Sequence, residues 1–171
     1  MTSKNFVVGA IVAAVAFGVS CSDSFPSLST KAPTKLFFTA NLTPDQEKPN
    51  PATGVSSKGT SDVTVLDTNL IRVETRVSTI DSVTQSHIHA GDANTAGPIM
   101  VFLLANVAAG RAPVTGTDQQ LSVVDIGRNT TFLAPFTFDS LMFRIKNGTA
   151  YTNVHTRKYP GGEIRGQIVP K

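Results

Sequence analysis

Cysteine is nearly absent from this chain of 171 residues: there is one, Cys21, and there is no tryptophan. A single cysteine excludes a disulfide framework within the chain and any zinc site built from several thiolates. Charged residues make up 16% of the chain, below the roughly 25% usual in soluble domains, which argues against a disordered chain or a coiled coil. No hydrophobic run approaches the roughly 20 residues needed to span a bilayer.

Basic residues exceed acidic ones only slightly, 15 against 12, and the net charge is +3. Only Arg157 and Lys158 are adjacent within the body of the chain, and no basic stripe interleaved with aromatic residues appears. Nucleic-acid binding is therefore not expected. The chain also lacks a Gly-x-Ser-x-Gly elbow, a phosphate-binding loop and a dinucleotide-binding fingerprint.

The first twenty residues have the form of an export signal. Lys4 precedes the apolar run 6–19, which is too short to span a membrane and suits a signal peptide. Small residues then lead to Cys21. Three interpretations remain: lipidation of Cys21 after cleavage, as in a bacterial lipoprotein, cleavage by a general signal peptidase with soluble secretion, or a buried N-terminal helix. The position of the lone cysteine favours lipidation and a place in the bacterial cell envelope.

Residues 21–34 are rich in Ser, Thr and Pro and are typical of a flexible tether. Residues 35–171 then form the predicted domain, which is long enough for one core.

Alternating apolar and polar residues predict a mostly β domain. The segments 60–66 and 70–77 alternate on either side of Asp67-Thr68-Asn69, which predicts a hairpin. Asn147-Gly148 predicts a second hairpin, between 141–146 and 149–155, since this dipeptide suits a type I′ turn. Further strands are expected over 35–41, 86–90, 99–104 and 163–169. Residues 105–140 are the least interpretable, with a short helical turn near 138–141. The expectation is about eight antiparallel strands in a sandwich or barrel.

Histidine is the main candidate for site chemistry, and the chain has three: His87, His89 and His155. In a strand, His87 and His89 lie on one face about 7 Å apart, close enough for both to bind one metal. His155 is expected on the same kind of face, because Val154 beside it should be in the core. If the two strands are close, three imidazoles converge, as for Cu(II) or Zn(II) with a fourth position open to water. Alternatively, the histidines are structural and bond to loop carbonyls.

Other polar groups give weaker signals. Asp81, Asp92 and Asp125 show no pairing that would indicate general acid–base catalysis. Glu163 and Arg165 share one face of a predicted strand and are expected to form a surface ion pair.

Five segments together resemble the chordin domain (CHRD) family: 46–51, 86–91, 97–102, 150–156 and 159–168. The resemblance covers residues 35–169. The family includes repeats in an animal extracellular antagonist of bone morphogenetic proteins and many single-domain exported bacterial proteins. With one copy and an export signal, this chain is similar to the bacterial kind.

A second resemblance concerns the histidines. The segment from His87 to Pro98, with Val154-His155 later, is similar to the copper-ligand motifs of Cu/Zn superoxide dismutase. This likeness implies that His87, His89 and His155 are copper ligands on a Greek-key β-barrel. It does not extend to a zinc site, because no bridging histidine remains and the loop after His89 is short. The expected fold is thus a Greek-key sandwich or barrel, superoxide-dismutase-like or immunoglobulin-like.

The sequence therefore predicts an exported, lipid-anchored CHRD-type domain with a non-enzymatic binding or structural role, and a three-histidine copper or zinc site as an open question. One alternative is a copper protein with redox or copper-handling activity at the same histidines. Another is a metal-free protein-interaction module with an extracellular protein partner.

The anchor prediction is tested by Cys21→Ser. If a lipid on this cysteine holds the protein to the membrane, the variant moves to the soluble fraction, while the control Ser22→Ala stays with the membrane. Cell fractionation and immunoblotting measure the partition. A Cys21→Ser protein that stays in the membrane fraction excludes lipidation.

Overall fold

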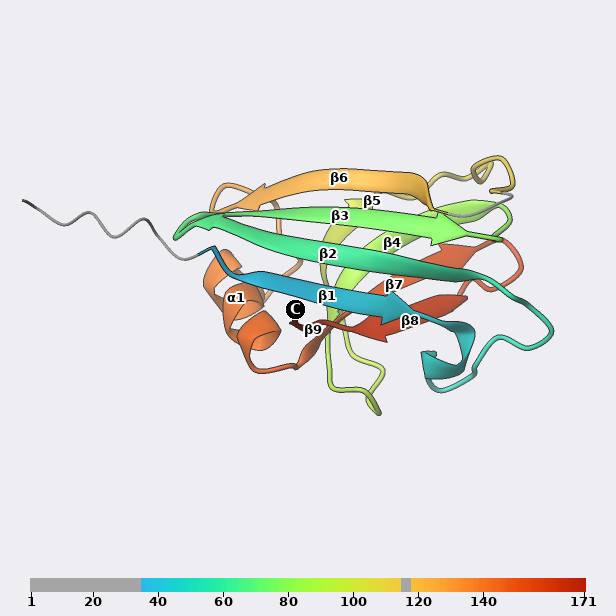
Figure 1. The fold of residues 1–171 in the computed structure, drawn as a ribbon, viewed down its shortest axis with the longest axis horizontal. Helices are drawn as coiled ribbons and strands as arrows, with labels where there is room; N and C mark the ends of the chain where they lie inside the picture. Colours follow the sequence, from blue (N-terminus) through green and yellow to red (C-terminus); the bar gives the residue numbers. More distant parts are fainter. Residues whose placement is uncertain (1–34, 115–117) are drawn as a thin grey trace, which may run out of the picture. The chain divides into compact units, whose positions relative to one another are not determined.

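The computed structural model describes residues 35–114 and 118–171, which fold into two β-sheets packed face to face (Figure 1). The predicted signal peptide 1–20, the predicted tether 21–34 and Cys21 lie outside the described residues. Within the described ranges, no helix is long and apolar enough to cross a membrane.

One sheet has five strands in the order β6-β3-β2-β1-β9, and the other has four in the order β5-β4-β7-β8. The strands of the first are β1 (Phe37–Leu42), β2 (Lys58–Asp67), β3 (Leu70–Ser78), β6 (Gln119–Gly127) and β9 (Val169–Pro170). Those of the second are β4 (Val83–Ala90), β5 (Ile99–Leu104), β7 (Ala150–Thr156) and β8 (Ile164–Gln167). The remaining elements in the described residues are a 3₁₀ turn, η1 (Pro44–Gln46), and one α-helix, α1 (Phe138–Lys146).

The strand connections follow a Greek key. β4 pairs with β5, β5 contacts β6 across the edges of the two sheets, and β7 returns to pair with β4. The spatial order β7-β4-β5-β6 is that of four strands in which the last lies beside the first. The predicted all-β sandwich is confirmed. The predicted final strand divides in two, because β8 belongs to the four-stranded sheet and β9 pairs with β1 in the other.

The core lies between the sheets and is built by period-two alternation. In β3, Ile71, Val73, Thr75 and Val77 are buried, while Arg72, Glu74 and Arg76 between them are partly exposed. The opposite sheet contributes Ile88 from β4 and Val154 from β7. The predicted hairpin at 67–69 is present and joins β2 to β3.

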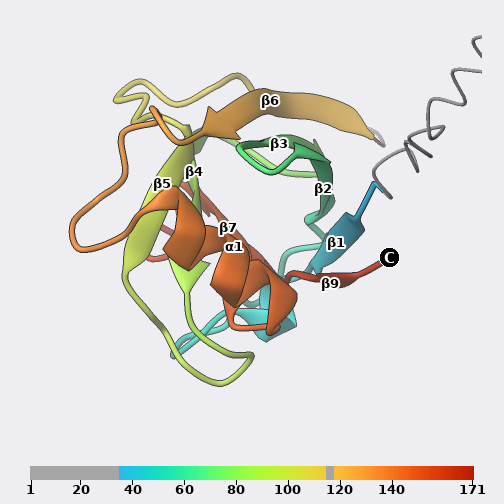
Figure 2. The ribbon, with the colours of Figure 1, turned by 90° about the vertical axis from the view of Figure 1, so that its left-hand side faces the viewer.

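The second predicted hairpin is wrong, because residues 138–146 form α1. This helix lies across one end of the sandwich (Figure 2) and buries Phe138, Leu141 and Ile145, spaced three and four residues apart. Its N-terminus has a capping box between Thr137 and Ser140.

The Asn147-Gly148 dipeptide ends the helix instead of forming a hairpin turn. Gly148 has φ +65°, and its N–H donates to the Ile145 carbonyl, while the Thr149 N–H donates to the Arg144 carbonyl. These two bonds are those of a Schellman motif. Both a type I′ turn and this helix end require positive φ, so the dipeptide alone does not distinguish them.

Strand β6 lies in the stretch that was least interpretable from sequence. Its pairing with β3 is irregular at Thr75–Arg76, where Leu121 is the extra residue between the partners Gln120 and Ser122. A bulge of this kind interrupts the alternation. As a result the buried residues Leu121 and Ile126 are five positions apart, and no regular pattern indicates a strand.

The N-terminal cap of α1 gives a test of this helix, which stands where the second hairpin was predicted. Thr137→Ala removes the side chain that accepts a hydrogen bond from the Ser140 N–H, and we expect a loss of about 1 kcal/mol in the free energy of unfolding. Urea denaturation measures it, with Thr68→Ala in the exposed β2–β3 turn as the control. Equal stability of the two variants would contradict the helix.

Candidate metal centre

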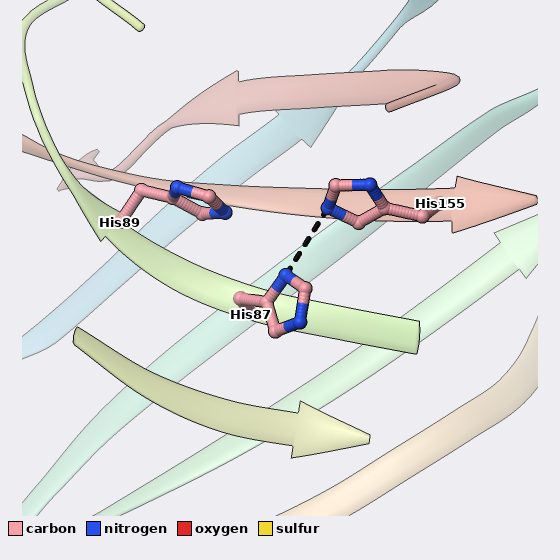
Figure 3. Close-up of side chains that lie close together, drawn as sticks. All are labelled: His87, His89 and His155. Carbon is pink, nitrogen blue, oxygen red and sulfur yellow. Dashed lines mark hydrogen bonds between the residues drawn. The ribbon is translucent and has the colours of Figure 1, made fainter. Parts of the chain in front are cut away.

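The pairing of β4 with β7 brings the three histidines together (Figure 3). In this antiparallel register Gln85 lies opposite His155, His87 opposite Asn153, and His89 opposite Tyr151. All of these residues occupy the face of the sheet turned away from the core, since Ile88 and Val154 on the alternate positions are core residues. His155 lies on the predicted face, and the condition for convergence is met because the two strands pair.

This face of the sheet is buried by loops instead of being exposed. His87, His89 and His155 are 0, 8 and 6% exposed. The loop after β4 places the Gly97 carbonyl 2.8 Å from Nδ1 of His89, and the loop after β7 places the Pro160 carbonyl 2.9 Å from Nδ1 of His155. The hydrogen bonds to loop carbonyls expected of structural histidines are therefore present, together with the convergence expected of a metal site.

These carbonyls determine which ring nitrogens remain available. A carbonyl only accepts, so Nδ1 carries the proton in His89 and His155, and Nε2 is the free lone pair in both. Nε2 of His89 is buried and has no hydrogen-bond partner. In His87, Nε2 lies 3.2 Å from the amide oxygen of Gln85, which makes Nε2 the donor and leaves Nδ1 as the lone pair.

Nδ1 of His87 lies 3.1 Å from Nε2 of His155 (Figure 3). With the protons placed as above, both atoms present lone pairs, an arrangement that a cation between them stabilises. If the Gln85 amide is reversed, His87 Nδ1 can instead carry a proton and donate it to His155. The space between these two nitrogens can therefore be occupied either by a metal cation or by a proton.

The distances fit a single metal ion. One nitrogen from each of the three histidines lies within 4.8 Å of the others. Nitrogens bound to one ion at about 2.0–2.1 Å in trigonal or tetrahedral geometry are about 3.3–3.6 Å apart, so the most widely separated pair needs to approach by about 1.2–1.5 Å. In the described residues, no Cys, Asp or Glu joins this group.

Burial keeps the imidazoles uncharged at neutral pH. Loss of solvation, with smaller contributions from His155 and His89, lowers the pKa of His87 to about 3. The same cause lowers the pKa of His89 to about 4, with Arg165 among the smaller contributors, and it also lowers the pKa of His155. Neutral imidazoles are the form that binds metal, so protons compete little for these nitrogens.

The surroundings contain residues that sequence reasoning missed. The Tyr151 ring stacks on His89 with centroids 4.8 Å apart, and the Phe102 ring meets His87 edge-on at 4.6 Å. The alternation of Tyr151, Asn153 and His155 along β7 was the available signal, because it places all three on one face.

The predicted surface ion pair between Glu163 and Arg165 is wrong. Both residues are buried, 4 and 1% exposed. Glu163 accepts a hydrogen bond from Thr156, and Arg165 donates to loop carbonyls. Loops cover this edge of the sheet, so the two residues are not on the surface.

The fold and cluster define an antiparallel β-sandwich with three converging histidines on one sheet. Comparison with family models adds the identity: residues 38–168 match the CHRD domain, and the chain belongs to the CHRD domain family. The resemblance drawn from the sequence motifs is confirmed. Comparisons with curated proteins and with solved structures give no match.

The lowered pKa values predict that acid destabilises the fold. Below the ordinary histidine pKa of about 6.5, the unfolded chain binds protons that the folded chain does not, so stability is full above pH 6.5 and falls towards pH 4. We expect roughly 1 kcal/mol per pH unit for each histidine, partly offset by Glu47, whose pKa burial raises.

Urea unfolding in the presence of a chelator at pH 7.5, 6.5, 5.5 and 4.5 measures this slope. His87→Gln should have a shallower slope than the parent protein over the same interval. Parallel slopes would show that His87 titrates normally in the folded chain.

Proposed function

We propose that this CHRD domain binds one metal ion, copper or zinc, through His87, His89 and His155. The observation that supports it best is the convergence of three uncharged imidazoles whose outer nitrogens bond to Gly97, Pro160 and Gln85. Bonds of this kind fix the ring orientation and leave the inner nitrogens aimed at one point, as in protein metal sites. Because these hydrogen bonds already hold the three rings in place, the site is organised before the ion binds.

The proposed setting is outside the cytoplasm, with the domain tethered to the cell envelope through lipidated Cys21. The export-type sequence of residues 1–20 and the position of the cysteine support it. In this setting the domain has a binding or structural role. Burial of the ligands favours holding an ion over turning over a substrate, because a catalytic metal keeps an open position.

A copper-dependent redox or copper-handling activity is a second candidate. It is supported by the purely imidazole ligand set, which suits copper. It requires a reactant to reach the ion past the loops that cover the histidines.

A metal-free interaction module is the third candidate. Leu36 just before β1, Phe37 in β1 and Val169 in neighbouring β9 are each more than 40% exposed. These apolar side chains lie at the β1–β9 edge of the five-stranded sheet. In this case the histidine cluster serves packing alone.

Metal titration of the purified protein distinguishes these functions. We expect one equivalent of copper or zinc to bind, and at 100 times the dissociation constant to stabilise the fold by about 2.7 kcal/mol in thermal melts. His89→Ala should weaken binding about 100-fold or more, because it removes one of three ligands. Gln120→Ala, on exposed β6 of the other sheet, should bind as the parent does.

The parent and the variants, each measured in the presence of a chelator, serve as the metal-free reference for folding. His89→Ala should remain folded without metal and lose only the metal-dependent stabilisation. If micromolar copper and zinc leave the melting temperature of the parent unchanged, the histidines are structural and the interaction module is the better account.

A further inference from the structure

Arg165 places a permanent positive charge beside the histidine cluster. It lies on β8, is 1% exposed, and its guanidinium carbon lies 3.4 Å from the centre of the Tyr151 ring. The group donates to the carbonyls of Asp92 and Thr95, and its Nη1 is buried with no partner. Among the described residues, no carboxylate lies within ion-pair distance of it.

The charge is separated from a metal ligand by a single aromatic ring. Strand β7 lies between β4 and β8, as Figure 1 shows, so Arg165 and His89 reach Tyr151 from opposite sides. Tyr151 contacts both: the guanidinium lies over its ring, and His89 stacks on it at an interplanar angle of 12°. The positive charge is therefore held at a fixed place near the ligand nitrogens.

Nothing in the ligand set offsets this charge. The three histidines are neutral ligands, and no Cys, Asp or Glu of the described residues joins them. The buried carboxylate of Glu47 bonds to the Asn153 amide and to the Lys48 N–H and interacts electrostatically with Arg165, but it is not among the metal-ligating groups. A divalent ion at the histidines adds two positive charges to the buried region that contains the Arg165 guanidinium.

We propose, on the basis of the three-histidine site, that this pocket selects a monovalent ion, Cu(I), over divalent Zn(II) and Cu(II). The repulsion from Arg165 is proportional to the charge of the ion, so a monovalent ion experiences half of that felt by a divalent one. The cost of moving an ion out of water also rises with the square of its charge, which disfavours a divalent ion in a buried site further. Zn(II) moreover takes a fourth ligand, which at this buried site the described residues do not supply and water would have to provide.

Competition titrations of the purified full chain under anaerobic conditions test the selectivity. The probes are Cu(I), Ag(I) as a monovalent ion that undergoes no redox change, Zn(II) and Cu(II), each against a chromophoric chelator of known affinity. We expect Cu(I) and Ag(I) to bind one equivalent, at least about tenfold tighter than Zn(II). Zn(II) binding as tightly as Ag(I) overturns the selectivity, and failure of every ion to bind overturns the metal site itself.

Charge removal tests the cause. Arg165→Met should strengthen Zn(II) binding about tenfold more than Ag(I) binding, because only the charge-dependent part of the affinity changes with ion valence. Arg72→Met, on the outer face of the five-stranded sheet, removes the same charge far from the histidines. It should leave the ratio of Ag(I) affinity to Zn(II) affinity unchanged. An equal change for both ions in Arg165→Met contradicts the role of Arg165.

Arg165→Lys keeps the charge and covers the case in which Arg165→Met does not fold. It should retain the parent's ratio of Ag(I) affinity to Zn(II) affinity. A ratio shifted towards Zn(II) would show that the charge of Arg165 is not the cause of the selectivity.

Discussion

The antiparallel pairing of β4 with β7 is the contact on which the fold and the site both depend. It joins residues that are 60 to 73 positions apart in the chain and closes the Greek key. Its register places Ile88 and Val154 in the core and, on the alternate positions, turns the histidines to the other face. Because side chains alternate strictly, a slip of one residue would move the imidazoles into the core and the aliphatic side chains out of it. Core packing therefore maintains the geometry of the site.

Burial of both faces of the four-stranded sheet imposes a further requirement. The outer face carries His87, Asn153 and Arg165, which lose water and need hydrogen-bond partners. Arg165, like His89 and His155, bonds to main-chain carbonyls of the loops. His87 and Asn153 bond to the side chains of Gln85 and Glu47. The same contacts exclude solvent, keep the imidazoles neutral and leave one nitrogen of each ring free. Stability of the covering loops and competence of the site arise from one set of hydrogen bonds.

Much of this arrangement was predictable from local pattern. Alternation identified the β2–β3 hairpin and placed His87 and His89 on one face, and the neighbouring Val154 correctly predicted the orientation of His155. Only a short helical turn near 138–141 was predicted at the start of α1, and residues 141–146 were assigned to a strand, since Asn147-Gly148 satisfies the same backbone requirement in a hairpin and in a helix end. Arg165 was misplaced on the surface, because alternation within a strand does not reveal which loops cover it. The sequence motifs identified the family, whereas the ligand nitrogens depend on loop carbonyls that no strand pattern indicates.

The use of carbonyls as partners has a consequence for mutational tolerance. Gly97 contributes its carbonyl to His89 and its N–H to the Tyr151 hydroxyl, and a β-carbon there would overlap the Ala90 carbonyl. The position is constrained by backbone path, and side-chain chemistry plays no part in it. Pro160 likewise acts on His155 through its carbonyl. A substitution scan of these loops would thus find the positions nearest the histidines sensitive to shape and insensitive to polarity, a profile opposite to that of a site whose outer contacts are side chains.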